Sequence, residues 1–344
     1  MAYPLIIFGA GASYDYSPLG KIAPLTNHLT NDEFLYPDLL EKYKGAGNLL
    51  SDIVHQVKTR NRNFEEVLTE MKRRTEGSKE MRTHFVALEF YLKDLFERIS
   101  KPTDLTRKTH QINNYKSIIN RINTYSNGKA LIATFNYDTL FESNLLSKIP
   151  TRMKDYVSEN IKIIKLHGSH DWVYINRIRS LEFAGEERSE TLSGYEVCMA
   201  NPDFIEQVKN QGSEPCHFQQ FKGRTESSQF HWFPALAIPL IGKGRYIPPK
   251  NHIQVLEQDL PTIDRVLIIG WRAGDPLLLE TLKRHLPQMG YKVLIVSNTK
   301  EGAEETAKTV RKGLNLINEN VVSVMGGGFS GFVSDEISNT FFNS

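Results

Sequence analysis

Residues 5–13 read Leu5-Ile6-Ile7-Phe8-Gly9-Ala10-Gly11-Ala12-Ser13, in which four apolar residues precede a Gly-Ala-Gly turn. The apolar run predicts a buried parallel strand, and a turn that leads into a helix directs backbone N–H groups toward one place. That place suits a pyrophosphate, which glycine allows to approach closely because it has no Cβ. The third glycine of the dehydrogenase pattern G-x-G-x-x-G would fall at Tyr14, so that pattern is not met. Taken alone, the stretch is also compatible with a plain tight turn between packed elements.

The composition is that of a globular protein without a strong overall charge. The chain has 344 residues, which is enough for a large core and two or three lobes. Its 42 Lys and Arg residues balance 40 Asp and Glu residues, so no overall field attracts nucleic acid. The apolar runs are far shorter than the ~20 residues that span a bilayer, and the N-terminus lacks the features of a signal peptide. We therefore expect a cytoplasmic protein that binds neither membranes nor nucleic acid directly.

The two cysteines, Cys198 and Cys216, are too few for a disulfide framework or a four-cysteine zinc site.

Six short apolar runs predict an α/β fold with a Rossmann-like parallel sheet. They are Leu5–Phe8, Ala130–Phe135, Ile161–Leu166, Arg265–Gly270, Lys292–Ser297 and Val321–Met325. Residues 14–129 are several times longer than one βαβ unit and predict a helical insertion between the first two strands. Within it, apolar residues recur at helical spacing over Met81–Ile99 and Tyr115–Ile122. A second insertion after the third strand, residues 172–234, has weak periodicity and is expected to be loop-rich and without zinc.

Polar residues follow the predicted strands, where an open parallel sheet binds its ligands. The segments are Thr134-Phe135-Asn136-Tyr137-Asp138, Lys165-Leu166-His167-Gly168-Ser169, Gly270-Trp271-Arg272-Ala273-Gly274-Asp275 and Ser297-Asn298-Thr299. We therefore expect glycine, amide, imidazole and carboxylate groups along one edge of the sheet. Taken singly, Asn136 or Asp138 could cap a following helix, and His167 could be a buried imidazole. Asp275 before Pro276 could be a helix N-cap.

Three of these motifs, in order, resemble the sirtuin family: Gly9–Ser13 matches G-A-G-x-S, Thr134–Asp138 matches T-x-N-x-D, and His167-Gly168 matches the following H-G. The residues within these motifs more closely resemble those of the divergent bacterial sirtuin-like proteins of antiphage defence. Those proteins share the Phe-Asn-Tyr-Asp sequence, a stretch like Asn63–Leu68 and a late strand that ends in glycine. The resemblance covers the sheet but neither insertion. It implies a single NAD-binding domain over residues 1–344.

The sequence also departs from the sirtuin deacetylases. Those enzymes carry a four-cysteine zinc module after the H-G motif, and this chain has only two cysteines in that region. Tyr14–Lys21 reads Tyr-Asp-Tyr-Ser-Pro-Leu-Gly-Lys where the family has Gly-Ile-Pro-Asp-Phe-Arg. These departures affect the cleft that holds an acetyl-lysine peptide in the deacetylases, and they leave the NAD-cleaving motifs intact.

Cleavage of the bond between nicotinamide and ribose needs a well-oriented sugar and one nucleophile, since nicotinamide is already a cationic leaving group. The resemblance implies that Asn136 and His167 are the catalytic residues at the nicotinamide ribose. An amide can hold a ribose hydroxyl or a water without taking a charge, and an imidazole can accept a proton near neutral pH. The expected NAD-binding residues are Gly9, Ala10, Gly11 and Ser13 for the pyrophosphate, Asp138 for the carboxamide, Ser297 and Asn298 for the adenosine ribose, and Gly270 at a late strand end. No metal is implied.

We therefore expect an NAD+ glycohydrolase that releases nicotinamide and ADP-ribose. The alternatives are an NAD-dependent protein deacylase and a non-catalytic module that senses NAD or ADP-ribose. A dehydrogenase is disfavoured by Tyr14 and by the lack of an acidic residue after a quickly following second strand.

Few residues follow Met325, so we expect any sensor or ATPase to be a separate partner protein. The helical insertion suggests a homo-oligomer that is built through residues 60–125.

Overall fold

The chain folds into two compact units. The first comprises Met1–Leu25, Ile99–His167 and Ile241–Ser344, and the second comprises Thr26–Arg98 and Gly168–Leu240. The structure, a computed structural model, describes residues 3–16, 23–25, 28–29, 35–101, 113–145, 150–177, 193–221, 230–240, 246–316, 318 and 321–343.

The first unit contains a six-stranded parallel sheet in the order β3-β2-β1-β7-β8-β9. The strands are β1 (Tyr3–Phe8), β2 (Ala130–Thr134), β3 (Ile161–Lys165), β7 (Ile263–Ile269), β8 (Lys292–Val296) and β9 (Val322–Met325). Counted along the chain, this is the order 3-2-1-4-5-6 of the doubly wound nucleotide-binding fold. All six predicted strands are confirmed, each to within two residues at either end. The α/β class and the Rossmann-like sheet are therefore correct.

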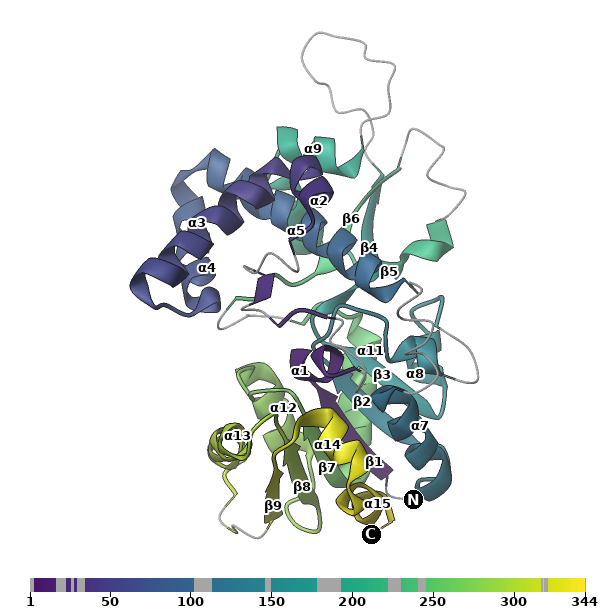
Figure 1. The fold of residues 1–344 in the computed structure, drawn as a ribbon. Helices are drawn as coiled ribbons and strands as arrows, with labels where there is room; N and C mark the ends of the chain where they lie inside the picture. The colour runs from purple at the N-terminus through teal and green to yellow at the C-terminus, as the bar shows by residue number, and fades with distance from the viewer. Residues whose placement is uncertain are drawn as a thin grey trace. The chain divides into compact units, whose positions relative to one another are not determined.

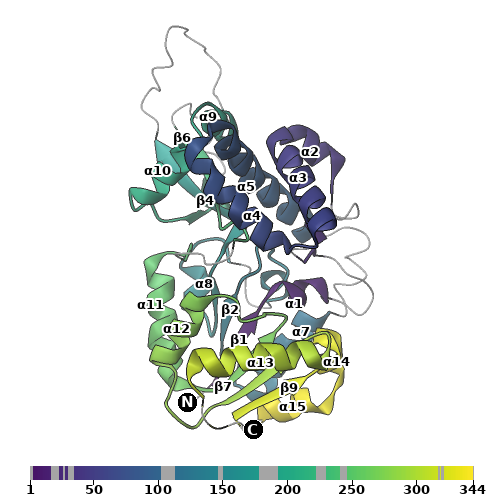
Figure 2. The ribbon, with the colours of Figure 1, turned by 90° about the vertical axis from the view of Figure 1, so that its left-hand side faces the viewer.

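Helices cover both faces of this sheet (Figures 1 and 2). One face carries α7 (Asn114–Tyr125), α14 (Gly328–Ser334) and α15 (Glu336–Asn343), and the other carries α11 (Lys250–Asp259), α12 (Pro276–His285) and α13 (Lys300–Leu314). Short elements lie at its edges: α1 (Ala10–Tyr14), η4 (Glu142–Asn144), α8 (Asp155–Ser158) and η6 (Leu260–Thr262).

Burial on both faces explains why the strands are continuous apolar runs. In β1, Leu5 and Ile7 belong to the core cluster that α11, α12 and α13 share with the sheet. Phe8, which points to the opposite face, packs its ring against Tyr115 of α7 and Phe329 of α14 at centroid distances of 5.0 and 5.9 Å. A strand with apolar contacts on both sides has no polar alternation in its sequence.

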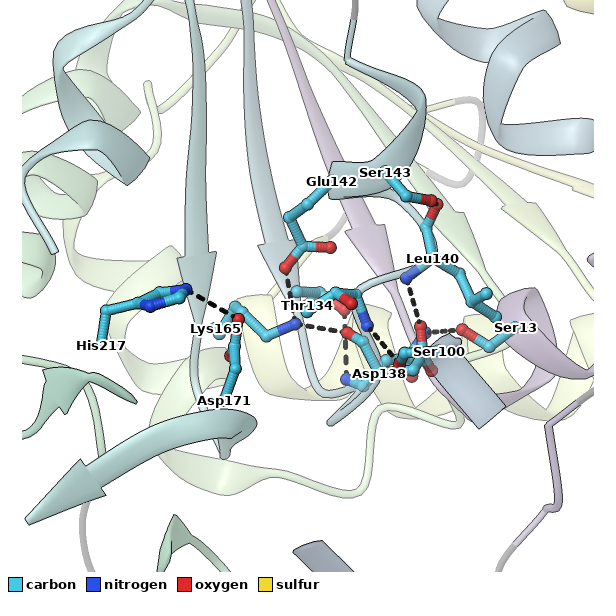
Figure 3. Close-up of polar contacts among 12 residues, drawn as sticks. Ser13, Ser100, Thr134, Asp138, Leu140, Glu142, Ser143, Lys165, Asp171 and His217 are labelled. Atoms are coloured by element: carbon cyan, nitrogen blue, oxygen red, sulfur yellow. Dashed lines mark hydrogen bonds and ion pairs between the residues drawn. The ribbon is translucent and has the colours of Figure 1, made fainter. Parts of the chain in front are cut away.

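The second unit combines helices with a small antiparallel sheet in the order β5-β4-β6. Its strands are β4 (Gly168–Arg177), β5 (Cys216–His217) and β6 (Phe230–Leu236). Its helices are α2 (Pro37–Lys42), α3 (Lys44–Arg60), α4 (Phe64–Arg73), η3 (Arg74–Gly77), α5 (Lys79–Ser100, whose last two residues belong to the first unit), α9 (Gly194–Ala200), α10 (Phe204–Asn210) and η5 (Phe218–Phe221). A side-chain contact between His217 and Asp171, with 2.9 Å between Nε2 and Oδ2, joins β5 to β4 (Figure 3).

Two expected boundaries differ from the structure. The helical insertion 14–129 is divided, because α7 packs its apolar side on the sheet of the first unit whereas α2 to α5 belong to the second. The described parts of residues 172–234 are more regular than a loop-rich insertion, since they contain most of β4 together with α9, α10, β5 and part of β6. These elements are short, which is why their periodicity is weak in the sequence. The chain thus forms two compact units, and a single NAD-binding domain over residues 1–344 stays a prediction.

Residues 17–21 of the Tyr14–Lys21 segment lie outside the described residues. None of the helices in the described part of the chain has the length and apolar character needed to cross a membrane.

Candidate active site

The strands of the large sheet end at one common level. Phe8 lies beside Thr134 of β2 and Ile269 of β7, and Thr134 lies beside Lys165 of β3. The residues that follow continue this ladder, since the Phe135 N–H donates to the Phe8 carbonyl at 3.0 Å. The motif residues therefore gather along the carboxyl edge of the sheet, as expected. The point where the strand order reverses, between β1 and β7, is where folds of this order bind their ligands.

Three glycines bring the turns after β1 and β7 into backbone contact. A Cβ on Gly9 would lie 2.4 Å from the Gly270 carbonyl oxygen, and a Cβ on Gly270 would lie 2.5 Å from the Ala12 nitrogen. Gly270 also has a φ of +64°, in the left-handed region that favours glycine. The N–H groups of Gly9 and Gly11 donate to the carbonyls of Ile269 and Gly270 at 3.0 and 3.2 Å. These two N–H groups are thus used between the loops, which differs from the expectation that they face an anion.

Two hydroxyl groups hold the side-chain amide of Asn136. Its Nδ2 donates to Ser13 Oγ at 2.9 Å and to the Tyr115 hydroxyl at 3.2 Å, and these two oxygens lie 2.9 Å apart. Burial raises the pKa of Tyr115 well above its usual value, so this hydroxyl stays protonated. Ser13 is fully buried and bonded inside the unit, so its side chain supports Asn136 and is not directed at a pyrophosphate.

The anchored amide leaves its oxygen as an acceptor. Asn136 is only 6% exposed, and its Oδ1 has no hydrogen-bond partner within the described part of the chain. An unsatisfied buried acceptor costs about 1–3 kcal/mol, which a ligand hydroxyl or a water would recover. The Oδ1 atom of Asn136 is therefore held in place and can accept a hydrogen bond from a ligand or a water.

A buried charged cluster ties the loop after β2 to the end of β3 (Figure 3). Lys165 Nζ donates to the Asp138 carbonyl oxygen at 2.5 Å and to Glu142 Oε1 at 2.7 Å. The Asp138 carboxylate accepts from the Leu140 N–H at 3.1 Å and from the Ser13 hydroxyl. Burial raises the pKa of Asp138, and the charge of Lys165 opposes this shift. Asp138 therefore stabilises its own loop through a local backbone contact. It does not cap the next helical element, η4, whose N-cap is Phe141.

His167 follows β3 and faces a carboxylate. Its Nε2 lies 3.4 Å from Asp275 Oδ2, and its ring forms a T-shaped pair with that of Phe135 at a centroid distance of 4.7 Å. Tyr137 lies nearly parallel to the imidazole at 6.4 Å, and Trp271 stacks on Phe135 at 5.1 Å. An imidazole beside a carboxylate and among aromatic rings has a defined orientation and restricted access to water.

Asp275 has two roles. Its Oδ1 accepts the Leu278 N–H at 2.8 Å, so it is the N-cap of α12 with Pro276 in the first turn, as one alternative predicted. Its other carboxylate oxygen faces His167, which the sequence did not reveal.

Ser297 and Asn298 follow β8 and are joined to the turn after β9. The Ser297 N–H donates to the Met325 carbonyl at 3.1 Å. The N–H groups of Gly327 and Gly328 donate to the carbonyls of Asn298 and Ser297 at 3.1 and 2.9 Å. Asn298 is exposed, so its side chain is accessible at the same sheet edge.

Three important residues were not predicted as members of the site. Tyr115 was counted only within an apolar stripe, although a hydroxyl in such a stripe needs a polar partner. Lys165 interrupts an apolar strand, and a charge in a buried strand is itself a signal of a paired interior group. The contact of Asp275 with His167 depends on the meeting of two loops 108 residues apart and leaves no local signal.

No group of three or more His, Cys, Asp or Glu side chains suited to a metal ion occurs in the ranges that the structure describes. Cys198 and Cys216 are free thiols.

Comparisons with known proteins give structural neighbours only. No protein-family model matches the chain, and no curated protein matches it. Among solved structures, a Sir2 bound to a p53 peptide and NAD+ is similar with a TM-score of 0.42 and 11% identity, over 98% of this chain and 93% of that one. A Sir2 in complex with an inhibitor, 2'-O-acetyl-ADP-ribose and a deacetylated p53 peptide has a TM-score of 0.39 and 11% identity, over 98% and 94%. The identities and TM-scores are low, and the fold assignment stands on the strand order and register described above.

Proposed function

We propose that this chain is an NAD+ glycohydrolase that cleaves NAD+ to nicotinamide and ADP-ribose. The observation that carries the proposal is the anchored amide of Asn136, whose buried Oδ1 lacks a partner within the described residues. It lies at the carboxyl edge of a 3-2-1-4-5-6 sheet, close to the position where such folds bind nucleotides. His167 supplies a base at the neighbouring strand end.

The reaction suits these groups. Breaking the bond between the anomeric carbon and nicotinamide places positive charge on the ribose, and the nicotinamide departs as a neutral molecule. The enzyme must orient the sugar and admit one water to the anomeric carbon. Asn136 Oδ1 would accept a ribose hydroxyl or hold that water without changing its charge. His167 would take the proton that the water loses as its oxygen bonds to the carbon.

The remainder of NAD+ would lie along the same edge. We propose that the Gly9–Ser13 turn lies beside the pyrophosphate, with Ala10 between the two loop-packing glycines, and that Gly270 shapes the facing loop. Ser297 and Asn298 would meet the adenosine ribose. The Asp138 carboxylate is hydrogen-bonded to Leu140 and Ser13, so we propose that other groups of the Asp138 loop contact the nicotinamide carboxamide.

The main alternative is an NAD-dependent protein deacylase, because the Sir2 neighbours were solved with acetylated or deacetylated peptides. The test is to incubate the purified full chain with NAD+, with and without an acetylated peptide, and to separate the products by chromatography. A glycohydrolase forms nicotinamide and ADP-ribose in equal amounts, and the peptide does not accelerate their release. Deacetylation coupled to nicotinamide release, together with stoichiometric zinc in the protein, would support the deacylase. Saturable NAD+ binding without products would instead support a sensing module.

We also propose that the enzyme acts in the cytoplasm as the effector of a bacterial antiphage defence system. Unregulated NAD+ cleavage would drain the cell, so activity would be switched by homo-oligomer formation and by a separate sensor or ATPase partner. The candidate surface within residues 60–125 is the end of α4 and η3, where Arg73, Arg74 and Glu76 are exposed, since α7 packs on the large sheet. Light scattering tests this: a monomer at micromolar concentration that NAD+ leaves unchanged would contradict the oligomer.

A further inference from the structure

The carboxylate of Asp275 bridges a helix end and the imidazole of His167. Oδ1 is fixed by the Leu278 N–H at 2.8 Å, which leaves Oδ2 directed at His167 Nε2, 3.4 Å away. Both side chains are largely buried, with 10% and 13% of their surfaces exposed. Pro276 in the first turn of α12 restricts the backbone next to the carboxylate. The orientation of Asp275 is therefore set by the fold and not only by its contact with His167.

We propose that Asp275 is a positioning residue that makes His167 a general base through Nδ1. This inference rests on the proposed NAD+ cleavage for its catalytic part. An ionised carboxylate accepts the Nε2–H, which fixes the tautomer with the lone pair on Nδ1. The same carboxylate stabilises the imidazolium that forms when Nδ1 takes a proton.

The proton balance of the step is complete. The oxygen of one water bonds to the anomeric carbon, and the bond from that carbon to the nicotinamide nitrogen breaks with its electron pair leaving on nicotinamide. The water proton passes to Nδ1, and the imidazolium beside Asp275 then releases it to solvent. The products are ADP-ribose, neutral nicotinamide and one proton, and no other reactant is needed.

Other titratable groups surround this pair, so their influence must be separated from that of Asp275. The ionisable side chains on the neighbouring strand ends and loops include Tyr137, Asp138 and Lys165, together with Arg272 in the loop of Asp275 and Tyr246, which interacts electrostatically with Asp275. Lys165 is bonded to Glu142 and to the Asp138 backbone, and burial raises the pKa of both Asp138 and Tyr246. In the pair with Asp275, one substitution, Asp275→Asn, removes the negative charge and keeps the shape of the side chain.

The test is an NMR titration of the histidines in the full chain between about pH 5 and 8, without NAD+. The variant is Asp275→Asn, which retains a good N-cap for α12. The control is Asp335→Asn, since Asp335 likewise accepts a helix-start N–H, that of Ile337 at 2.8 Å. The His167 signal is assigned from its loss in His167→Gln.

We expect Asp275→Asn to lower the pKa of His167 by about one unit, because the neutral amide no longer stabilises the imidazolium. Asp335→Asn should leave it unchanged. An unchanged His167 pKa in Asp275→Asn would overturn the proposal. If that variant does not fold, the His167 pKa is measured in Asp275→Ser, which also caps a helix, and the same lowering is expected.

The pH profile of nicotinamide release then tests the catalytic part. The acid limb should move to lower pH in Asp275→Asn, with a maximal rate at least tenfold lower, and Asp275→Glu should restore part of it. Equal profiles would overturn the positioning role. A shifted His167 pKa in a wild-type protein that releases no nicotinamide would refute the proposed function and leave the Asp275–His167 pair standing.

Discussion

Replacing the loop-packing glycines by alanine should destabilise the first unit strongly. The Cβ of Gly9→Ala would lie 2.4 Å from the Gly270 carbonyl oxygen, at least 0.6 Å inside the 3.0 Å limit that real Cβ contacts respect. The obstructing atoms are backbone, so relief requires the two loops to separate. Overpacking of this kind costs about 1–3 kcal/mol of unfolding free energy. In Gly270→Ala the alanine must also adopt the left-handed backbone of Gly270, which costs about 1–2 kcal/mol more. The two costs together lower the unfolding free energy of this variant by about 2–5 kcal/mol.

Hydrogen exchange is a suitable assay because it reports on each unit separately. Peptides from β1 and β7 give the opening free energy of the large sheet, and a loss of 2 kcal/mol accelerates their slow exchange about 30-fold. Peptides from β4 and β6 serve as an internal reference in the second unit.

Gly274→Ala is the matched control, because it lies in the same loop and a Cβ there meets nothing within 4 Å. It should change the opening free energy by no more than about 0.5 kcal/mol. Wild-type exchange in Gly9→Ala and Gly270→Ala would contradict this prediction. Equal losses in all three variants would contradict it too, because Gly274→Ala places its Cβ in open space.

Three further predictions concern the interior. Lys165→Met should lose about 3–5 kcal/mol of unfolding free energy, because it leaves a buried carboxylate unpaired; unchanged exchange in β3 would contradict this. Burial raises the pKa of Cys216 to about 12 and that of Cys198 further, so both thiols stay protonated at neutral pH and should react slowly with iodoacetamide until the chain is unfolded. Fast labelling of either thiol in the native protein would contradict this prediction. Tyr115→Phe removes one of the hydroxyls that hold the site amide and should slow NAD+ cleavage about 3- to 10-fold, whereas Tyr125→Phe, on the exposed side of the same helix, should not.

The large sheet could be predicted because its strands are buried on both faces. Continuous apolar runs such as Leu5–Phe8 identify such strands without any knowledge of their partners, and the polar residues that follow them then share one edge. The helix α7 was also predicted from its apolar spacing over Tyr115–Ile122, and it ends at Tyr125, just before the left-handed backbone of Asn127 and Gly128. Its place on the large sheet was not, because periodicity reveals an apolar face but not the surface that covers it.

The part of the second unit that follows β3 was harder to predict because its described helices and strands are short and mixed. β5 has two residues, and β4 begins inside the His167-Gly168 motif, where no strand was predicted. The interior partners of the site were missed for another reason. Tyr115 and Asp275 lie far along the chain from Asn136 and His167, and only the packed fold brings their polar atoms together.

The most direct test of the account compares nicotinamide release from NAD+ by the wild-type chain with that by Asn136→Ala and by His167→Ala. Circular dichroism and exchange in β1 first establish that the variants are folded. We predict that the wild type releases nicotinamide and ADP-ribose together and that each variant loses most of this activity. For His167→Ala the loss should be about 10²–10⁴-fold, as expected for a general base. Folded variants that keep more than a tenth of the wild-type rate would contradict the account.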